Sequence, residues 1–355
     1  MDHFFDLSSL LSGHTGGVLP LPNHNPSLGQ EYLLSDSGAL SPISSATGHG
    51  NSSSAGTSSL AAPAPTLVAA NGSNLQIDLI WDKSVAGAPT GFTAAVIAAA
   101  QTYVNDFTSA GKTVLYINVG WGEVGGTSMA ANALGESESS GYLTNYTTVT
   151  HALSNAGYSF SASNEPTTGQ FFVTSAQAKT LGLISGISGS ASSVDGYVGF
   201  STLSGTGNSW NFNATGTTSS QYNLQAVADH EISEVMGRIG MEGTAVYNGH
   251  KTYTPLDLFN FKAPGVLALS GQGGYFSTNN GVTQMGSFNN AVKYGGDIAD
   301  WASYSSVSQS GTLSSGSDAF NAFGRPGYNV SLSADDLREV ASLGYKLTTA
   351  GARLA

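Results

Sequence analysis

The chain of 355 residues carries 11 Lys and Arg against 23 Asp and Glu, which gives a formal net charge of -12, and it contains no cysteine. The excess of negative charge argues against nucleic-acid binding, because phosphates require clustered basic residues. The lack of cysteine excludes disulfides and thiolate metal sites. No apolar stretch is long enough to cross a membrane.

The first 72 residues contain neither Lys nor Arg, and residues 41–62 are rich in Ser, Gly and Ala without any periodicity. Such a composition is typical of a flexible linker, so we expect a flexible, low-complexity N-terminal segment over residues 1–72. The richness in Gly, Ser, Thr, Asn and Ala resembles that of bacterial secreted proteins. Because a cleaved signal peptide needs a positively charged start, the expected extracellular location requires an export route without one.

The ordered part is expected to begin near Asn74 with a strand, a helix and a second strand. Partial alternation of apolar residues predicts a strand at residues 75–81. Pro89 opens a predicted helix over residues 90–110, and the apolar stretch 112–119 predicts the second strand. This order indicates a crossover pair.

Further elements are predicted along the chain. Two short helices and a strand are expected at residues 144–155, 175–183 and 195–202. Residues 209–213 are expected to pair with that strand through a turn. A last helix is expected over residues 333–343, where Ser333 can cap the first turn and Gly344 can end the helix.

Residues 225–240, QAVADHEISEVMGRIG, are the main candidate for chemistry. On a helix, His230 and Glu234 share one face, Glu231 lies beside them, and apolar residues form a second stripe that can face a core. The pattern is close to H-E-x-x-H, in which two imidazoles bind zinc and the glutamate between them activates water. Here Glu234 replaces the second histidine. The pattern indicates a metal hydrolase.

The order of elements that ends in this helix resembles the zincin metallopeptidases, and the metzincin branch in particular. The long metzincin motif is H-E-x-x-H-x-x-G-x-x-H. Aligned on it, His230 matches the first ligand, Glu231 the catalytic base and Gly237 the glycine at which the helix turns. Glu234 and Gly240 stand where the second and third histidines belong.

Residues 75–347 are also similar to an uncharacterised group of bacterial secreted zincin-like proteins, which carry an HEISEVMGR-type motif followed by a PLDLF segment. The resemblance implies an α+β, zincin-like fold, with a twisted mixed sheet packed on a long helix and an active-site helix. It implies an N-terminal subdomain over residues 73–240, which includes the motif helix. A loop-rich C-terminal subdomain over residues 241–355 would complete the cleft.

The resemblance also implies a mixed set of metal ligands, in which His230 supplies nitrogen and Glu234 supplies oxygen. Asp257 is the first choice for the third ligand, because another zincin branch uses H-E-x-x-H together with an aspartate from a following segment. Glu242 and His250 are the alternatives. Such a set suits catalytic zinc, and two carboxylates would also tolerate harder metals such as Mn²⁺ or Ca²⁺.

Structural interpretations of the same residues stay open. Glu234 and Arg238 are four residues apart and can form an ordinary ion pair on the helix surface. Asp257 can instead be a turn residue. A calcium ion can be bound in addition through the oxygen atoms of three later aspartates, Asp297, Asp300 and Asp318.

The predicted function is that of a secreted, metal-dependent endopeptidase, a hydrolase that acts on protein or peptide substrates. Glu231 would activate a water molecule held by the metal, and that water would attack the peptide carbonyl. The main alternative is a non-catalytic extracellular surface or matrix protein on a zincin scaffold, which the missing second histidine and the polar composition motivate. A glycoside hydrolase that uses Glu231 and Glu234 as its carboxylate pair is a third alternative.

Overall fold

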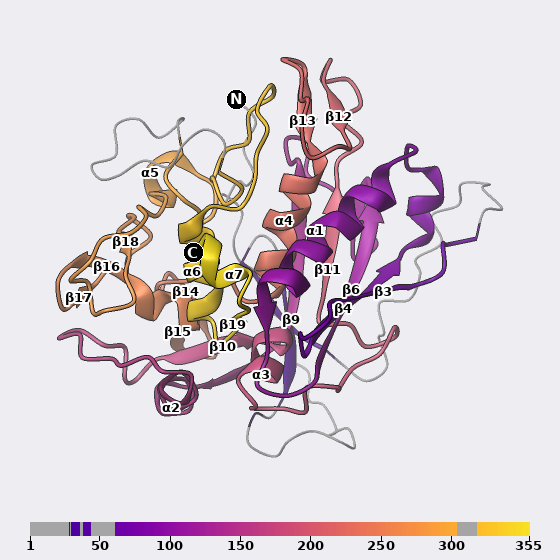
Figure 1. Ribbon diagram of the computed structural model, residues 1–355. Coiled ribbons are helices and arrows are strands. Elements are labelled where there is room, and N and C mark those ends of the chain that lie inside the picture. Colours follow the sequence, from indigo (N-terminus) through magenta and orange to yellow (C-terminus); the bar gives the residue numbers. More distant parts are fainter. Residues whose placement is uncertain (1–27, 29, 36–37, 44–60, 304–317) are drawn as a thin grey trace.

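The computed structural model describes residue 28 and residues 30–35, 38–43, 61–303 and 318–355. Within these residues the protein has a mixed α/β fold, in which a large mixed sheet of ten strands packs against helices (Figure 1). The expected mixed sheet on helices is therefore confirmed. No helix in the described part of the chain is long and apolar enough to cross a membrane. Most of the predicted linker, residues 44–60, lies outside the described residues.

Eight strands of the large sheet follow the order β14-β15-β10-β9-β11-β6-β4-β3, and β1 and β2 are added beside β9. The ten strands are β1 (Glu31–Leu34), β2 (Leu40–Pro42), β3 (Thr66–Ala69), β4 (Leu75–Trp81), β6 (Thr113–Trp121), β9 (Gly135–Asn145), β10 (Gln170–Thr174), β11 (Gly196–Phe200), β14 (Ala245–Tyr247) and β15 (His250–Tyr253). β4 and β6 are parallel, so the predicted crossover pair is confirmed. β9 is antiparallel to β1, β10 and β11.

Two helices, α1 (Phe92–Asp106) and α4 (Leu224–Val235), lie side by side against the sheet (Figure 1). Helix α3 (Ser175–Thr180) directly follows β10, and the Nζ atom of its Lys179 lies 5.2 Å from the centre of the Tyr116 ring. The remaining helices are η1 (Lys83–Gly87), α2 (Tyr146–Asn155), η2 (Pro255–Phe259), α5 (Ala291–Tyr294), α6 (Ala334–Ser342) and α7 (Gly351–Leu354).

Helix α1 forms because it is rich in alanine, a strong helix former, and because its buried residues recur at helical spacing. It is shorter than the predicted helix over residues 90–110. Its C-terminal neighbours extend into β5 (Phe107–Thr108), which pairs with β19 (Lys346–Leu347) near the end of the chain. Pairing with a distant strand therefore ends the helix at Asp106, before the predicted end at residue 110.

The predicted pairing of residues 209–213 with the strand at residues 195–202 is wrong. β12 (Ser209–Asn211) instead forms a parallel pair with β13 (Gln221–Asn223), which directly precedes α4. β11 lies between β6 and β9 and is hydrogen-bonded to both. Both of its edges are thus occupied, and no edge is free for a hairpin partner.

Residues 1–72 are not only a flexible segment, since three of their stretches are strands of the large sheet. β3 pairs with β4 at one end of the sheet, and Val68 is buried there. β1 pairs with β9 on one side and with β2 on the other. These strands are short, and β1 is added to an edge formed by residues far along the chain, so local composition did not indicate it.

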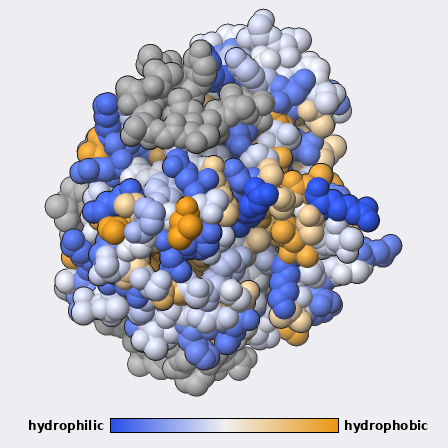
Figure 2. Space-filling view, turned by 60° about the vertical axis from the view of Figure 1, so that its left-hand side comes forward, coloured by the Kyte–Doolittle hydropathy of each residue, from blue (hydrophilic) through white to orange (hydrophobic). Residues whose placement is uncertain are grey.

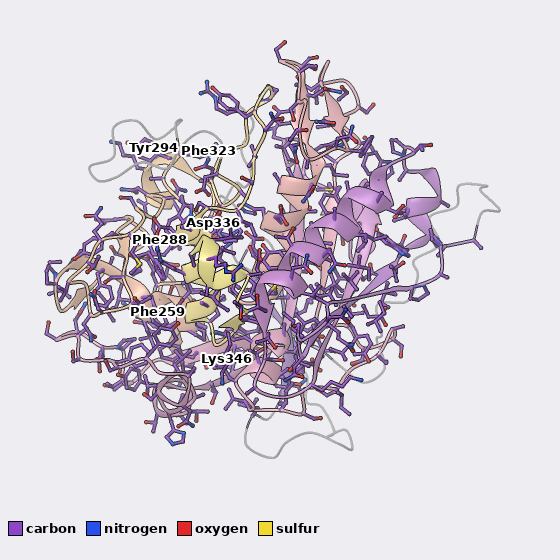
Figure 3. All side chains as sticks on the ribbon, viewed as in Figure 1. Phe259, Phe288, Tyr294, Phe323, Asp336 and Lys346 are labelled. Carbon is purple, nitrogen blue, oxygen red and sulfur yellow. The ribbon has the colours of Figure 1, made fainter. Side chains whose placement is uncertain are left out.

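The C-terminal part packs around aromatic side chains. Phe276 lies 6.0–6.4 Å from the rings of Phe259, Phe288 and Trp301, measured between ring centroids. Figure 3 shows Phe259 and Phe288 among these segments, away from α1. The predicted last helix is confirmed as α6, with a capping box between Ser333 and Asp336. The smaller strands are β7 (Glu123–Val124), β8 (Thr127–Ser128), β16 (Asn260–Ala263), β17 (Val266–Leu267) and β18 (Tyr275–Phe276).

The surface shown in Figure 2 carries small groups of apolar residues separated by polar ones. Single exposed apolar side chains such as Val246 and Val282 are ordinary on a protein surface. Chemistry is therefore better sought in the interior, where the motif helix lies.

Candidate metal centre

Helix α4 carries the motif residues into the interior. It begins after Asn223, whose side chain accepts a hydrogen bond from the amide of Ala226 at 2.9 Å. It ends before Gly237, whose φ of 115° is a conformation that favours glycine, so the predicted turn at this residue is confirmed. Every residue from Ala226 to Val235 is buried. The polar motif residues must therefore find partners inside the protein.

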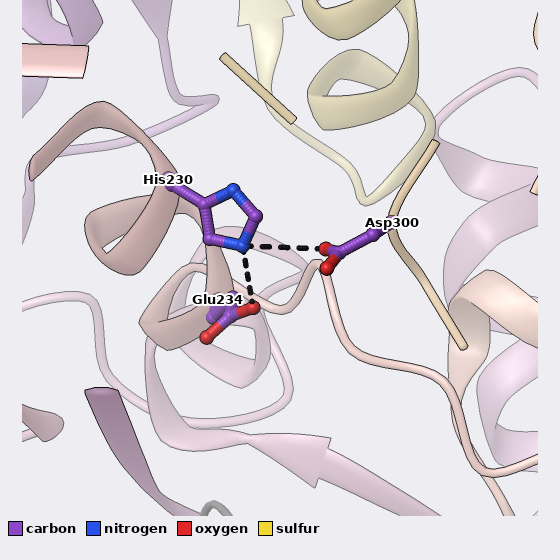
Figure 4. A group of neighbouring side chains, drawn as sticks. All are labelled: His230, Glu234 and Asp300. Carbon is purple, nitrogen blue, oxygen red and sulfur yellow. Dashed lines mark ion pairs between the residues drawn. The ribbon is translucent and has the colours of Figure 1, made fainter. Parts of the chain in front are cut away.

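Three of the buried side chains, His230, Glu234 and Asp300, converge on one point (Figure 4). The Nε2 atom of His230 lies 3.2 Å from Oε1 of Glu234 and 3.3 Å from Oδ1 of Asp300. The three ligand atoms all lie within 4.8 Å of one another. Two ligands on a tetrahedral zinc ion, with bonds of about 2.05 Å, lie about 3.3 Å apart. The group could therefore hold a metal ion.

The hydrogen bond of the second ring nitrogen, Nδ1, determines the tautomer of His230. Nδ1 lies 2.9 Å from the carbonyl oxygen of Ala319. A carbonyl can only accept, so Nδ1 carries a hydrogen, and the neutral ring presents the lone pair of Nε2 to the two carboxylates. Burial opposes a charge on the ring, but the nearby Asp300 carboxylate outweighs it, so the pKa of His230 lies well above its ordinary value. The raised pKa concerns the second ring proton, which Nε2 carries in the charged form. Binding of a cation at Nε2 would displace this proton.

Asp300 is held in place by backbone hydrogen bonds of its segment. Its carbonyl oxygen accepts from the amide of Asn289 at 2.7 Å, and the amide of Trp301 donates to the carbonyl of Phe320 at 2.8 Å. The residue before Phe320 is Ala319, the partner of His230. Burial works against ionisation of Asp300, but His230 and Arg238 outweigh it and lower its pKa. The C-terminal part of the chain therefore completes the site.

Arg238 forms the ion pair with Glu234 that the sequence left open, and it also bridges to Asp300. Nη2 of Arg238 lies 3.2 Å from Oε1 of Glu234, and Nη1 lies 2.6 Å from Oδ1 of Asp300. The guanidinium lies 4.3 Å from the centre of the Phe320 ring and is fully buried. The carboxylate oxygens that face His230 thus share one fixed positive charge.

Glu231 is fully buried beside this group, and neither of its carboxylate oxygens has a hydrogen-bond partner among the described residues. Burial, followed by the charge of Glu234, raises its pKa well above the ordinary value. Strand β9 passes close by, and Ser137 donates to Oε2 of Glu234 at 2.7 Å. A buried carboxylate without partners is costly unless a proton, water or a cation neutralises it.

We expect Gly135→Ala to displace the Glu231 carboxylate. A Cβ atom at Gly135 would lie 2.4 Å from Oε1 and 2.7 Å from Cγ of Glu231, so the side chain must move. Overpacking of this kind should lower the free energy of unfolding by about 1–3 kcal/mol. Urea unfolding and a crystal structure of the variant provide the measurement.

Gly87→Ala is the matched control for this substitution, because a Cβ atom at Gly87 meets nothing within 4 Å. We expect it to change the stability by less than about 0.5 kcal/mol. A Gly135→Ala protein as stable as this control, with Glu231 unmoved, would contradict the close approach of β9 to the motif helix.

Asp257, the first choice for the third ligand, is not part of the group, and Asp300 takes that place. Oδ2 of Asp257 accepts hydrogen bonds from the amides of Glu242 at 2.7 Å and Thr254 at 2.8 Å. With Thr254 it forms the capping box of η2. Burial and the charge of Glu242 raise the pKa of Asp257 to about 8 against these donors. These hydrogen bonds indicate that Asp257 is a structural turn residue, which is the alternative that the sequence left open.

The two substitutes for Asp257 also lie outside the group. The carboxylate of Glu242 accepts hydrogen bonds from the side chain of Asn260 and from backbone amides, and His250 is exposed on β15. Of the three aspartates expected at a calcium site, only Asp300 belongs to the group. Within the residues that the structure describes, no second group of three such ligands is found.

Comparison of the chain with models of known protein families gave no match, and neither the curated proteins nor the solved structures gave one. The function is therefore argued from the geometry of this site.

Proposed function

We propose that this protein is a zincin-like, zinc-dependent peptidase whose centre is formed by His230, Glu231, Glu234 and Asp300. One observation carries the proposal: a buried imidazole faces two carboxylates at ligand spacing, and Glu231 lies beside them without a hydrogen-bond partner among the described residues. The resemblance of the motif to that of the metzincins supports the same function.

The charges of the site support a divalent cation. With Glu231, Glu234 and Asp300 ionised and His230 neutral, the guanidinium of Arg238 and a divalent cation bring the net charge to zero. Without a cation, neutrality requires protons on both His230 and Glu231, and these are the directions in which burial and neighbouring charges shift their pKa values. Buried charges are tolerated only when they are balanced in this way. A cation would thus replace two protons.

A bound cation would supply Lewis acidity, which lowers the pKa of water and polarises a peptide carbonyl. Glu231 would accept the proton of the attacking water and pass it to the leaving amine. Ala319 would keep His230 in the required tautomer, and Ser137 would orient Glu234. We place this activity outside the cell, as the composition indicates.

A second candidate is a non-catalytic protein in which the same residues form a structural ion-pair network. The contacts of Arg238 with both Glu234 and Asp300 favour it, because the guanidinium already provides a counter-charge. The two candidates differ in whether the purified protein contains a metal ion.

Elemental analysis of the native protein should find about one zinc ion per chain, and treatment with EDTA should lower the melting temperature. Asp300→Asn should weaken zinc binding by at least about tenfold, because an amide is a poorer ligand than a carboxylate. Asp257→Asn is the control and should retain the metal while losing stability, since Asp257 accepts only backbone hydrogen bonds.

Loss of casein hydrolysis on chelation, with recovery on addition of zinc, completes the test. Protein without stoichiometric metal and with an unchanged melting temperature in EDTA would instead support the structural network.

A further inference from the structure

We propose that the β1–β2 segment, residues 30–35 and 38–43, is a displaceable strap that closes access to the His230–Glu234–Asp300 group. The proposal deepens the proposed function by adding its regulation, and it rests on that function only for the role of the group. The position of the strap is a separate observation.

The strap occupies the outer edge of β9. Ser139 of β9 pairs with Gly196 of β11 and also with Leu34 of β1, so β1 lies on the side of β9 opposite to β11. The register places residues 31–34 against residues 142–139, in antiparallel order. The same strand, β9, carries Gly135 and Ser137, which contact Glu231 and Glu234. Ser137 and Gly135 therefore lie two and four residues along β9 from Ser139, the last residue that pairs with the strap.

The strap also forms one wall of a cavity that reaches the site. The cavity has a volume of about 50 Å³ and is lined by Glu234, by Ser137 and Ser139 of β9, and by Leu34, Ser35 and Gly38 of the strap. Space of this size holds a few water molecules and no polypeptide. Because His230, Glu231 and Asp300 are 0% exposed, a peptide substrate can reach them only if a wall of the site moves.

The strap is the wall that can be released without breaking the rest of the sheet. β2 pairs only with β1, and β9 would keep its pairs with β10 and β11 after release. An isolated two-stranded hairpin is only marginally stable. Its anchors are the packing of Leu34 with Ile239 and Met241, and the contact of Tyr32 with Tyr247 at 5.3 Å between ring centroids. No disulfide ties it down, since the chain has no cysteine.

Glu31 makes the docking of the strap onto β9 sensitive to pH. It is half-buried and lies near Asp195, which precedes β11, and near Lys179 of α3, with Tyr142 of β9 and Tyr197 of β11 also facing it. Burial, then Asp195, raise the pKa of Glu31 to about 7, and Lys179 opposes this shift. Docking therefore favours protonated Glu31. It is most favourable below the ordinary pKa of 4.5 and weakens as the pH rises to about 7.

A disulfide across the pair of Leu33 and Ser140 tests the strap. The amide of Ser140 donates to the carbonyl of Asp195, away from β1, so the pair is not hydrogen-bonded and its Cβ atoms are close enough to bridge. In the Leu33→Cys/Ser140→Cys variant, stripped of metal, zinc uptake should be at least about tenfold slower in the oxidised than in the reduced form. Casein hydrolysis should fall in parallel.

Leu67→Cys/Asp78→Cys is the matched control, because it bridges β3 and β4 at the far end of the sheet. Its oxidised and reduced forms should take up zinc at the same rate. Equal rates of zinc uptake in both forms of the Leu33→Cys/Ser140→Cys variant would overturn the proposal that the strap closes access to the site.

If the stripped protein binds no zinc in either form, the proposed function has failed. Hydrogen exchange of backbone amides then tests, without zinc, whether the strap is released from β9. The amides of Ser139 and Gly141 point toward β1. Their protection, corrected for the chemical exchange rate, should fall between pH 5 and pH 8 by about tenfold or more, and Glu31→Gln should remove this dependence. Protection that does not change with pH, or that changes equally in Glu31→Gln, overturns the proposal.

Discussion

Glu231→Gln is expected to abolish hydrolysis of casein while the protein stays folded and keeps its zinc. The substitution preserves the size of the side chain and removes the group that accepts the proton of water. A general base contributes about 10²–10⁴-fold to the rate. Because the carboxylate of Glu231 accepts no hydrogen bond from the described residues, its removal breaks no contact of the fold. Initial rates, zinc content and melting temperature of the purified variant are the measurements.

Glu339→Gln is the matched control for this experiment. Glu339 lies on α6, is also fully buried, and also has two carboxylate oxygens without a hydrogen-bond partner among the described residues. The control therefore reproduces the change in buried charge at a position outside the proposed centre, and we expect it to remain active. Full activity of Glu231→Gln, or equal loss in both variants, would contradict the role of Glu231 as the base.

Arg238→Met should lower the free energy of unfolding of the metal-free protein by about 3–5 kcal/mol, the usual cost of breaking a buried ion pair. The reason is that Glu234 and Asp300 would then remain buried without the guanidinium that lies 3.2 Å and 2.6 Å from them. Excess zinc should restore much of the loss, because it would bind the same carboxylates. Urea unfolding in EDTA and in zinc measures both effects.

Arg338→Met provides the comparison, because Arg338 pairs with Asp335 near the surface, where the two side chains are 41% and 34% exposed. It should cost less than about 1 kcal/mol. If Arg238→Met costs no more than this control, Arg238 is not the counter-charge of the site. A large loss that zinc does not repair would favour the structural network over the metal centre.

Local signals in the sequence were sufficient for the elements that form the frame of the site. The crossover of β4, α1 and β6, the motif helix with an apolar stripe toward the core, and the cap of α6 at Ser333 follow from apolar spacing and from capping residues. The predicted proximity of His230 and Glu234 is confirmed, because residues four apart on a helix share a face.

The rest of the site depends on contacts between distant parts of the chain, which single-sequence patterns do not contain. The sequence predicts Asp300 only as a member of a calcium site, although an aspartate among apolar residues in IADW is a signal of burial. The resemblance to another zincin branch favours Asp257 instead. The capping-box pattern that Thr254 and Asp257 form was the better signal there.

The hydrogen bond from His230 to Ala319 joins residues 89 positions apart, and this separation matters for biosynthesis. A ribosome that adds about 5–20 residues per second needs roughly 4–18 s to make the intervening stretch. During that time the nascent polypeptide has the imidazole but not the carbonyl that selects its tautomer. Under the proposed function, the metal would therefore bind only after residue 319 has been made and has folded against α4.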